Sequence, residues 1–231
     1  WAIIREAFSR RVIVPGATRT DDVTWWLRER IVSLNMTTWF QPPVTVLASF
    51  GDGGGDNVIR EGDYLHVDFG LYAMGLATDT QHVAYVLRDG ERAAPAGLTR
   101  ALRVGNALQD IIRKELVPDA TGNDAFERAS ANMRAAGIDG LIYSHPVGAF
   151  GHSAGSLVGL SGAQRRLPVL GDVPMLPHTW YSVECSVSVA VDELGGAKVR
   201  VPLEEDVVLG GNEAPMPAAW VYGQQTELIL V

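Results

Sequence analysis

The sequence predicts an α+β domain with antiparallel strand pairing, and the order of its elements is the main evidence. Helical patterns fill the first forty residues, a hairpin follows, two more helices come next, and the last third is mostly strand and loop. This order lacks the strand–helix alternation that builds a doubly wound parallel sheet. With 231 residues, 47% of them hydrophobic and 20% charged, the composition is that of an ordinary globular protein. We therefore expect residues 1–231 to form a single domain.

Charge and hydropathy exclude several classes of partner. The formal net charge of −8 argues against binding to nucleic acid or an anionic membrane, because both require a clustered basic face. The sequence contains no apolar run long enough to cross a bilayer. Its single cysteine, Cys185, rules out an internal disulfide framework. We expect a soluble, cytoplasmic protein, unless a leader or a further domain precedes Trp1, which is not a methionine.

The first two predicted elements are helices. Residues 2–10 carry their apolar side chains at helical spacing. A second helix is expected to begin at Thr20, because a capping hydroxyl is followed there by Asp21 and Asp22, which favour the positive end of a helix dipole. An apolar stripe then continues over residues 23–34.

Strands and two longer helices follow. The pattern predicts a strand over residues 44–49 and a hairpin with a tight turn at residues 73–75. The second of the two later helices is expected to end at Gly137, in a C-cap position. The hairpin strands are predicted over residues 64–72 and 76–87, the helices over 93–116 and 124–136, and further strands over 141–144, 180–191, 197–201, 206–209 and 226–231.

Two aspartates in the hairpin are the first sign of chemistry. If the turn centres between Ala73 and Met74, Asp68 and Asp79 lie directly opposite each other across the two strands. Opposed carboxylates repel and destabilise a hairpin unless something positive lies between them. A divalent cation would relieve this repulsion, and so would a shared proton, as in aspartic proteases. The alternative is two exposed acids on a solvated face of the sheet.

Three further residues strengthen the interpretation as a metal site. His152 lies among glycines and small residues, where little bulk shields its imidazole. Glu184 and Glu227 each interrupt an otherwise apolar strand pattern, and carboxylates are rarely buried without a partner. Four carboxylates and one imidazole suit a pair of divalent ions such as Mn, Co, Fe or Zn. A lone histidine, however, is more often structural than a ligand.

The order of these residues resembles that of the pita-bread metallopeptidases, which include methionine aminopeptidases, Xaa-Pro aminopeptidases, prolidases and creatinase. The motifs appear in the order Asp, Asp, His, Glu, Glu and extend over nearly the whole chain. Each short motif is weak alone, but five in order are specific. They are Gly-Asp-Tyr-Leu-His-Val-Asp-Phe-Gly at 62–70, Thr-Asp-Thr at 78–80, Gly-His-Ser-Ala-Gly at 151–155, Ser-Val-Glu at 182–184 and Gln-Thr-Glu at 225–227.

The resemblance implies a pita-bread fold, with two pseudo-symmetric αβ halves around a central dinuclear site. It implies that Asp68 chelates one ion, that Asp79 and Glu227 bridge both, and that His152 and Glu184 complete the other. Two such ions would generate hydroxide from a bridging water and polarise the scissile carbonyl. A ligating carboxylate, Glu184, would pass a proton to the leaving amine. The expected substrates are short peptides cut at an N-terminal or Xaa-Pro bond.

The chain also departs from the family pattern. Members usually carry a histidine in the loop before the hairpin, and residues 49–57 contain none. They usually carry a second histidine shortly after the metal-binding one, and residues 156–160 contain none. These histidines help to bind substrate. His145, which precedes a proline, is a candidate catalytic substitute or simply a structural residue.

These departures leave two alternatives to a peptidase. One is a dinuclear hydrolase of a non-peptide amide or ester. The other is a catalytically silent pita-bread binding protein, although a silent copy has no reason to keep a destabilising cluster of acids. A metal-free hydrolase like creatinase is disfavoured because such proteins lose the acidic set. Relatives are often dimers, so the resemblance also suggests a homodimer.

Overall fold

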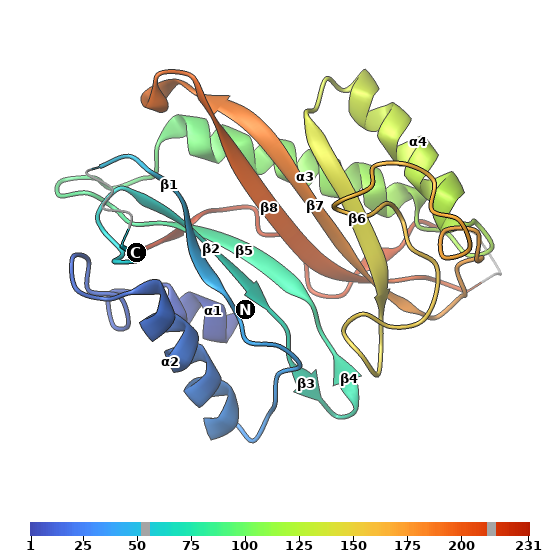
Figure 1. Ribbon diagram of the computed structural model, residues 1–231, viewed down its shortest axis with the longest axis horizontal. Coiled ribbons are helices and arrows are strands. Elements are labelled where there is room, and N and C mark those ends of the chain that lie inside the picture. Colours follow the sequence, from blue (N-terminus) through green and yellow to red (C-terminus); the bar gives the residue numbers. More distant parts are fainter. Residues whose placement is uncertain (52–55, 212–215) are drawn as a thin grey trace.

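The computed structural model describes residues 1–51, 56–211 and 216–231, and its centre is one strongly curved sheet (Figure 1). Part of the segment noted above for lacking a histidine, residues 52–55, lies outside the described residues. The main strand order is β1-β2-β5-β8-β7-β6, and all these neighbours pair antiparallel. The strands are β1 (Val44–Ser49), β2 (Asp63–Phe69), β5 (Thr80–Tyr85), β6 (Gly140–Val147), β7 (Trp180–Val191) and β8 (Ala197–Val208).

Two pairs of helices divide the sheet into halves. Helices α1 (Ala2–Ala7) and α2 (Thr20–Ser33) lie on the side of β1 and β2, whereas α3 (Ala96–Glu115) and α4 (Gly122–Ala135) lie on the side of β6 to β8 (Figure 1). Each pair shields its half from water. The prediction of α+β architecture with antiparallel pairing is therefore confirmed.

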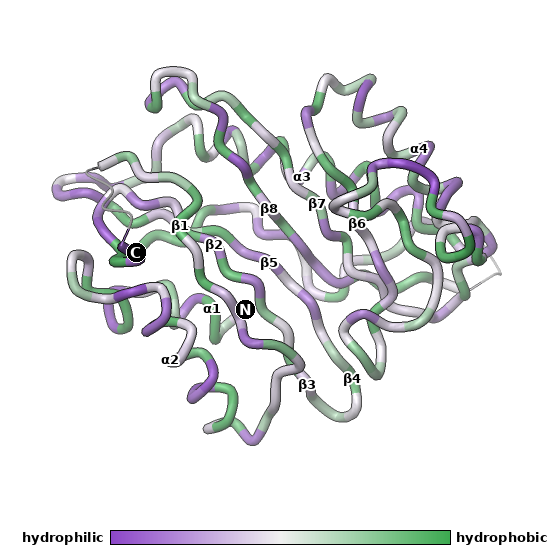
Figure 2. Tube along the Cα trace, in the orientation of Figure 1, coloured by the Kyte–Doolittle hydropathy of each residue, from purple (hydrophilic) through white to green (hydrophobic). Residues whose placement is uncertain are grey.

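Each half has its own hydrophobic core. The first contains Leu27 and Leu65, and the second contains Leu102, Val183 and Leu203, all fully buried or nearly so. In the second half α3 approaches β8 closely at Gly105, where a Cβ atom would lie 2.6 Å from Leu203. Figure 2 shows that the sheet between the cores is not uniformly hydrophobic, because hydrophilic residues lie along β5 and β8. These residues form the site described below.

The two halves meet where β5 and β8 touch and then diverge. Gln81 and Glu204 are the single residue pair recorded between these strands in the described chain. Beyond them, Gln225 fills the gap, because its side chain accepts from the Val83 N–H at 2.9 Å and donates to the Val83 carbonyl at 2.7 Å. The short strand β10 (Ile229–Leu230) then continues beside β5 in a parallel pair. The junction thus leaves polar groups between the halves.

Several boundaries differ from the prediction. The region expected to hold two strands, 197–201 and 206–209, is one continuous strand, β8, which passes through Pro202. Proline and three consecutive acids are unusual in a central strand, so the pattern suggested a break. The last predicted strand, 226–231, shrinks to β10, and the tip of the hairpin forms two short strands, β3 (Tyr72–Ala73) and β4 (Leu76–Ala77).

The remaining elements are small. A 3-10 turn, η1 (Asp192–Leu194), links β7 to β8, and β9 (Ala219–Trp220) pairs with the end of β8. Among the described residues, none of the helices has the length and apolar character needed to span a membrane.

Candidate metal centre

Four strands place their polar side chains in one row across the sheet. Asp68 of β2 pairs with Gln81 of β5, Gln81 pairs with Glu204 of β8, and Glu204 pairs with Glu184 of β7. Directly paired residues point to the same face, with Cβ atoms about 4.5–5.5 Å apart. The register of the sheet alone therefore gathers three carboxylates and one amide on one face, at the junction of the two halves.

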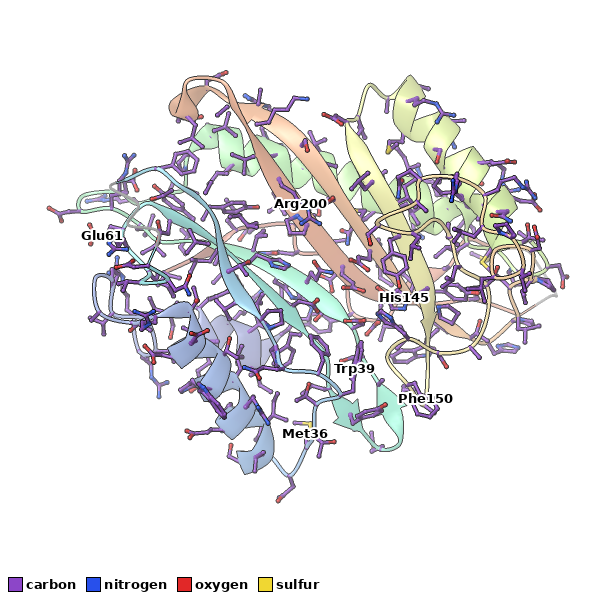
Figure 3. The ribbon with its side chains drawn as sticks, in the orientation of Figure 1. Met36, Trp39, Glu61, His145, Phe150 and Arg200 are labelled. Carbon is purple, nitrogen blue, oxygen red and sulfur yellow. The ribbon has the colours of Figure 1, made fainter. Side chains whose placement is uncertain are left out.

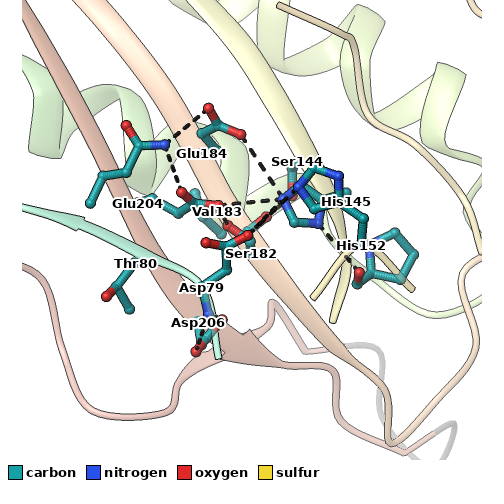
Figure 4. A network of polar contacts seen from close by, with 12 residues as sticks. Asp79, Thr80, Ser144, His145, His152, Ser182, Val183, Glu184, Glu204 and Asp206 are labelled. Carbon is teal, nitrogen blue, oxygen red and sulfur yellow. Dashed lines mark hydrogen bonds and ion pairs between the residues drawn. The ribbon is translucent and has the colours of Figure 1, made fainter. Parts of the chain in front are cut away.

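A second row lies beside the first. His145 of β6 pairs with Ser182 of β7, which in turn pairs with Asp206 of β8. Asp79 joins this row just before β5 begins, and its backbone N–H donates to both carboxylate oxygens of Asp206, at 3.3 and 3.4 Å. Because Ser182 is small, the His145 ring reaches over β7 toward the acids of β8. Figure 4 shows most of this site, with Asp79, His145, Ser182, Glu184, Glu204 and Asp206 labelled.

The hairpin register differs from the prediction by one position in the turn. Asp68 pairs with Gln81, so facing positions sum to 149 and the turn centres between Met74 and Gly75. Asp68 and Asp79 are consequently diagonal neighbours on one face rather than directly opposed residues. Diagonal pairs still lie within reach of each other, and one oxygen from each of Asp68, Asp79 and Glu204 lies within 4.8 Å of the others.

The centre of the site is the imidazole of His145. Its Nε2 lies 3.4 Å from Glu204 Oε1, 3.7 Å from Asp79 Oδ2 and 4.0 Å from Glu184 Oε2. The opposite nitrogen, Nδ1, lies 3.3 Å from the Pro146 carbonyl. A carbonyl can only accept, so Nδ1 carries the hydrogen and Nε2 presents a lone pair to the acids. Burial also lowers the pKa of His145, which favours this neutral form.

The carboxylates perturb one another because they share a buried space. Burial, reinforced by Glu204, raises the pKa of Asp68 to about 8 and that of Asp79 to about 11. The same two causes raise the pKa of Glu184 to about 8 and that of Asp206 to about 8. Burial raises the pKa of Glu204 itself to about 7, against the opposing hydrogen bonds from Ser182 and Gln81. In the protein alone, these acids resist losing their protons.

A site for divalent cations fits these residues. Asp68 Oδ1 and His145 Nε2 are buried without any hydrogen-bond partner, which is costly unless a ligand satisfies them. In the described part of the chain, no lysine or arginine forms an ion pair with the acids of the two rows, and only histidines approach them. The described residues contain three possible ligand groups. Two of them share Glu204: one adds Asp68 and Asp79, and the other adds His145 and Glu184. The third joins Asp79 and His145 to His152. Oxygen and imidazole donors suit borderline and hard divalent ions.

His152 occupies the rim rather than the centre. Its side chain is 55% exposed, and its Nε2 lies 3.7 Å from Asp79 Oδ2. Its ring lies beside His145, Trp39 and Tyr143, with centroid distances of 4.2, 5.3 and 6.0 Å. Figure 3 labels Trp39 and His145, whose rings both lie beside the ring of His152. The sequence placed His152 among the metal ligands and His145 outside them, and the structure brings both to Asp79, with His145 the more deeply enclosed.

Glu227 is not brought to this site. It is exposed, it precedes β10, and it lines a separate cavity with Arg5 and Tyr222. The expected strand around it does not form, because the Gln225 side chain points inward. That side chain accepts a hydrogen bond from the Val83 N–H and donates to the Val83 carbonyl. Its amide also donates to the Glu227 backbone carbonyl. The fourth carboxylate of the cluster is instead Glu204, which is 1% exposed.

The sequence contained one signal for Glu204. It is the first of three consecutive acids, at 204–206, between the apolar stretches 201–203 and 207–209. A charge run normally indicates solvent, yet all three side chains are buried. The opposing signal, Pro202, concealed the strand. Gln81 gave no signal at all, because its role depends on its pairing with Glu204.

Comparison with known proteins identifies the family and the fold. Residues 2–210 match the sequence model of metallopeptidase family M24. No curated protein matches the sequence. Many solved structures do match, among them the X-Pro aminopeptidase from Thermotoga maritima MSB8, with a TM-score of 0.73 and 17% identity over 100% of this chain. This chain covers 59% of that protein and so spans well under two thirds of its length.

Two further structures show the same fold. The Xaa-Pro dipeptidase from Bacillus anthracis is 21% identical, with a TM-score of 0.68 over 100% of this chain and 60% of its own. The methionine aminopeptidase from Rickettsia prowazekii is 14% identical, with a TM-score of 0.65 over 95% of this chain and 91% of its own. At these identities the likeness concerns the fold, and it confirms the expected pita-bread architecture.

Proposed function

Since the chain belongs to metallopeptidase family M24, we propose that it is a metal-dependent peptidase that cleaves short peptides at an N-terminal or Xaa-Pro bond. The observation that carries the proposal is the convergence of Asp79, Glu184 and Glu204 on the lone pair of His145, with Asp68 beside Asp79 and Glu204. Among the described residues, no lysine or arginine forms an ion pair with these acids. Such a buried cluster is destabilising on its own and becomes favourable once cations fill it.

We take the ligand set from the two groups that share Glu204, and we leave out the third because its His152 is exposed at the rim. We assign Asp68 to one ion and His145 with Glu184 to the other. Asp79 and Glu204 lie between the groups and contact both sets, so we assign them to both ions. This assignment replaces Glu227 with Glu204, and His152 with His145. Mn, Co, Fe and Zn are all compatible with oxygen and imidazole donors.

Bound divalent ions would supply an activated water and would polarise the scissile carbonyl. The surrounding residues then orient the reaction. His152, exposed at the rim and close to Asp79, is placed to hydrogen-bond an incoming peptide. It follows His145 by seven residues, so the chain does carry a second histidine shortly after the proposed ligand. Glu184, whose Oε2 faces His145, is placed to pass a proton to the leaving amine.

The direct test is metal-dependent hydrolysis of Xaa-Pro dipeptides and tripeptides. Protein stripped by a chelator should be inactive, and added Mn²⁺ or Co²⁺ should restore activity. Asp79→Ala should remove both activity and metal, whereas Asp89→Ala, which alters an exposed acid far from the cluster, should retain both. Full activity after exhaustive chelation would rule out the proposal.

One observation keeps a second substrate class open. Residues 49–57 contain no histidine, although family members usually carry one before the hairpin. The same centre would then act on a non-peptide amide or an ester whose recognition does not need that group. A panel that pairs peptides with non-peptide amides and esters separates the two classes, because the preferred class should show the higher kcat/KM with the same metal dependence.

A further inference from the structure

Gln81 contacts both glutamates of the proposed centre. It is buried, at 6% exposure, and its amide nitrogen donates to Glu204 Oε2 at 2.7 Å and to Glu184 Oε1 at 3.1 Å. These glutamates come from β8 and β7, so one amide of β5 links three strands at the junction of the halves. Both hydrogens of the amide are used. The remaining oxygens, Glu204 Oε1 and Glu184 Oε2, are the ones that face His145.

Hydrogen bonds from His66 and Thr45 fix the orientation of the Gln81 side-chain amide. The Gln81 carbonyl oxygen lies 2.9 Å from His66 Nε2, and His66 Nδ1 lies 3.3 Å from the Thr45 hydroxyl. Because the amide oxygen can only accept, Nε2 must donate, and Nδ1 then accepts from Thr45. The reversed amide would point its oxygen at two carboxylates. The chain Thr45–His66–Gln81 thus has one consistent arrangement of hydrogens, and it delivers two N–H donors to the acids.

We propose that Gln81 is a positioning residue of the metal centre, which holds one oxygen of Glu184 and one of Glu204 so that the other oxygens point to His145 and the ion. This inference rests on the proposed function. A lysine or arginine here would make similar hydrogen bonds, but its charge would compete with the cation. The neutral amide orients the acids without that competition. Outer residues of this kind contribute about 10–100-fold to metal affinity.

The test is metal affinity rather than activity. In the full chain, Gln81→Met keeps the size of the side chain and removes both donors. The matched control is Gln225→Met, because Gln225 is an equally buried glutamine that bonds β5 at Val83 and does not contact Glu184 or Glu204. Titration calorimetry with Mn²⁺ should show affinity about 10–100-fold weaker for Gln81→Met. Gln225→Met should bind like the wild type, even where its melting temperature falls.

An affinity of Gln81→Met equal to that of the wild type would overturn the inference. If Gln81→Met does not fold, His66→Leu provides the test, because it leaves Gln81 in place and releases only its oxygen. That variant should also bind Mn²⁺ more weakly, and unchanged binding would again overturn the inference. Glu204→Gln distinguishes a failure of the proposed function from a failure of the role of Gln81 alone. If the wild type binds no divalent ion, the proposed function fails. If Glu204→Gln loses binding while Gln81→Met retains it, only the role of Gln81 fails.

Discussion

His145 Nε2 lies 3.4 Å from Glu204 Oε1, although their strands, β6 and β8, are not neighbours in the sheet. The strand between them, β7, carries Ser182 at this level, and its hydroxyl donates to the same Glu204 oxygen. A small residue on β7 therefore lets a histidine and a glutamate meet above it. This contact joins β6 to β8 within one half of the sheet. Glu204 in turn pairs with Gln81 of β5, which pairs with Asp68 of β2 in the other half.

Substitution should distinguish the role of His145 in metal binding from the role of His152 in catalysis. His145→Ala removes the buried nitrogen that we assign as a metal ligand. It should weaken Mn²⁺ binding by more than about 100-fold, the upper end of the effect that outer residues have. His152→Ala, at the exposed rim, should keep the metal and lower kcat/KM by about a hundredfold through loss of a group that stabilises developing charge. Metal content by elemental analysis and peptide kinetics measure both effects. Loss of metal in His152→Ala with retention in His145→Ala would reverse the assignment.

Substitution should also show which of Glu204 and Glu227 is the metal ligand. Glu204→Gln keeps the shape of a buried side chain and removes its charge, so metal binding and activity should both fall sharply. Glu227→Gln changes an exposed residue outside the cluster and should leave metal content and kcat/KM within about twofold of the wild type, as surface substitutions usually do. Elemental analysis of the two purified variants is sufficient. A metal-free Glu227→Gln variant would contradict the geometry.

Stability of the metal-free protein should fall as pH rises. Asp68, Glu184 and Asp206 have pKa values raised to about 8 in the folded state, whereas the unperturbed values are 3.8 for Asp and 4.5 for Glu. Between about pH 4 and pH 8 the folded state keeps protons that the unfolded chain has lost. The free energy of unfolding therefore decreases by up to about 1.4 kcal/mol per pH unit for each such acid.

Urea denaturation of protein stripped of metal by a chelator, at pH 5, 6.5 and 8, measures how the free energy of unfolding changes with pH. A flat profile would show that the acids are already charged and compensated. The exposed pair Arg166 and Glu127 provides a comparison, because exposed ion pairs contribute little to stability. Glu127→Gln should leave the slope unchanged, and Glu204→Gln should reduce it.

Divalent ions should reverse that profile. A ligand that binds only the folded state stabilises it by about 2.7 kcal/mol at a concentration of 100 times Kd. Metal ligation requires deprotonated carboxylates, so Mn²⁺ should raise the melting temperature more at pH 8 than at pH 5. Differential scanning fluorimetry with and without Mn²⁺ at both values measures the difference. Equal shifts at the two pH values would point to metal binding away from the acidic cluster.

Packing around Trp39 should control the rim of the site. The Trp39 indole N–H donates to the Thr78 carbonyl at 3.1 Å, and a Cβ atom on Gly151 would lie 2.1 Å from its ring. Gly151→Ala should therefore displace the indole, destabilise the protein by about 1–3 kcal/mol and raise KM, because the adjacent His152 moves with it. Gly162→Ala, where a Cβ has nothing within 4 Å, is the control. Chemical denaturation and steady-state kinetics give both quantities.

Local patterns were sufficient for most elements of the fold. The start of α2 at Thr20, the alternation of the hairpin and the apolar spacing of α3 and α4 depend on neighbours in the chain, so they could be predicted. The expected capping hydroxyl was wrong, because the N-cap is Arg19, whose backbone N–H donates to Asp22. Asp68 and Asp79 were predicted from their places in the hairpin, and Glu184 from its place in an otherwise apolar strand pattern. The turn position was wrong by one residue. A shift of the turn centre by one residue keeps both aspartates on one face, which is why the prediction that they meet survived.

The sequence by itself determined which elements form and which acids are conspicuous, since both follow from side chains a few residues apart. Only the tertiary structure decided that Glu204 rather than Glu227 joins the cluster, and that His145 lies deeper than His152. Those choices depend on the register of β8 against β5 and β7, and on Gln225 filling the gap where β5 and β8 diverge. Contacts between strands so distant in the chain leave no periodic trace in the order of residues.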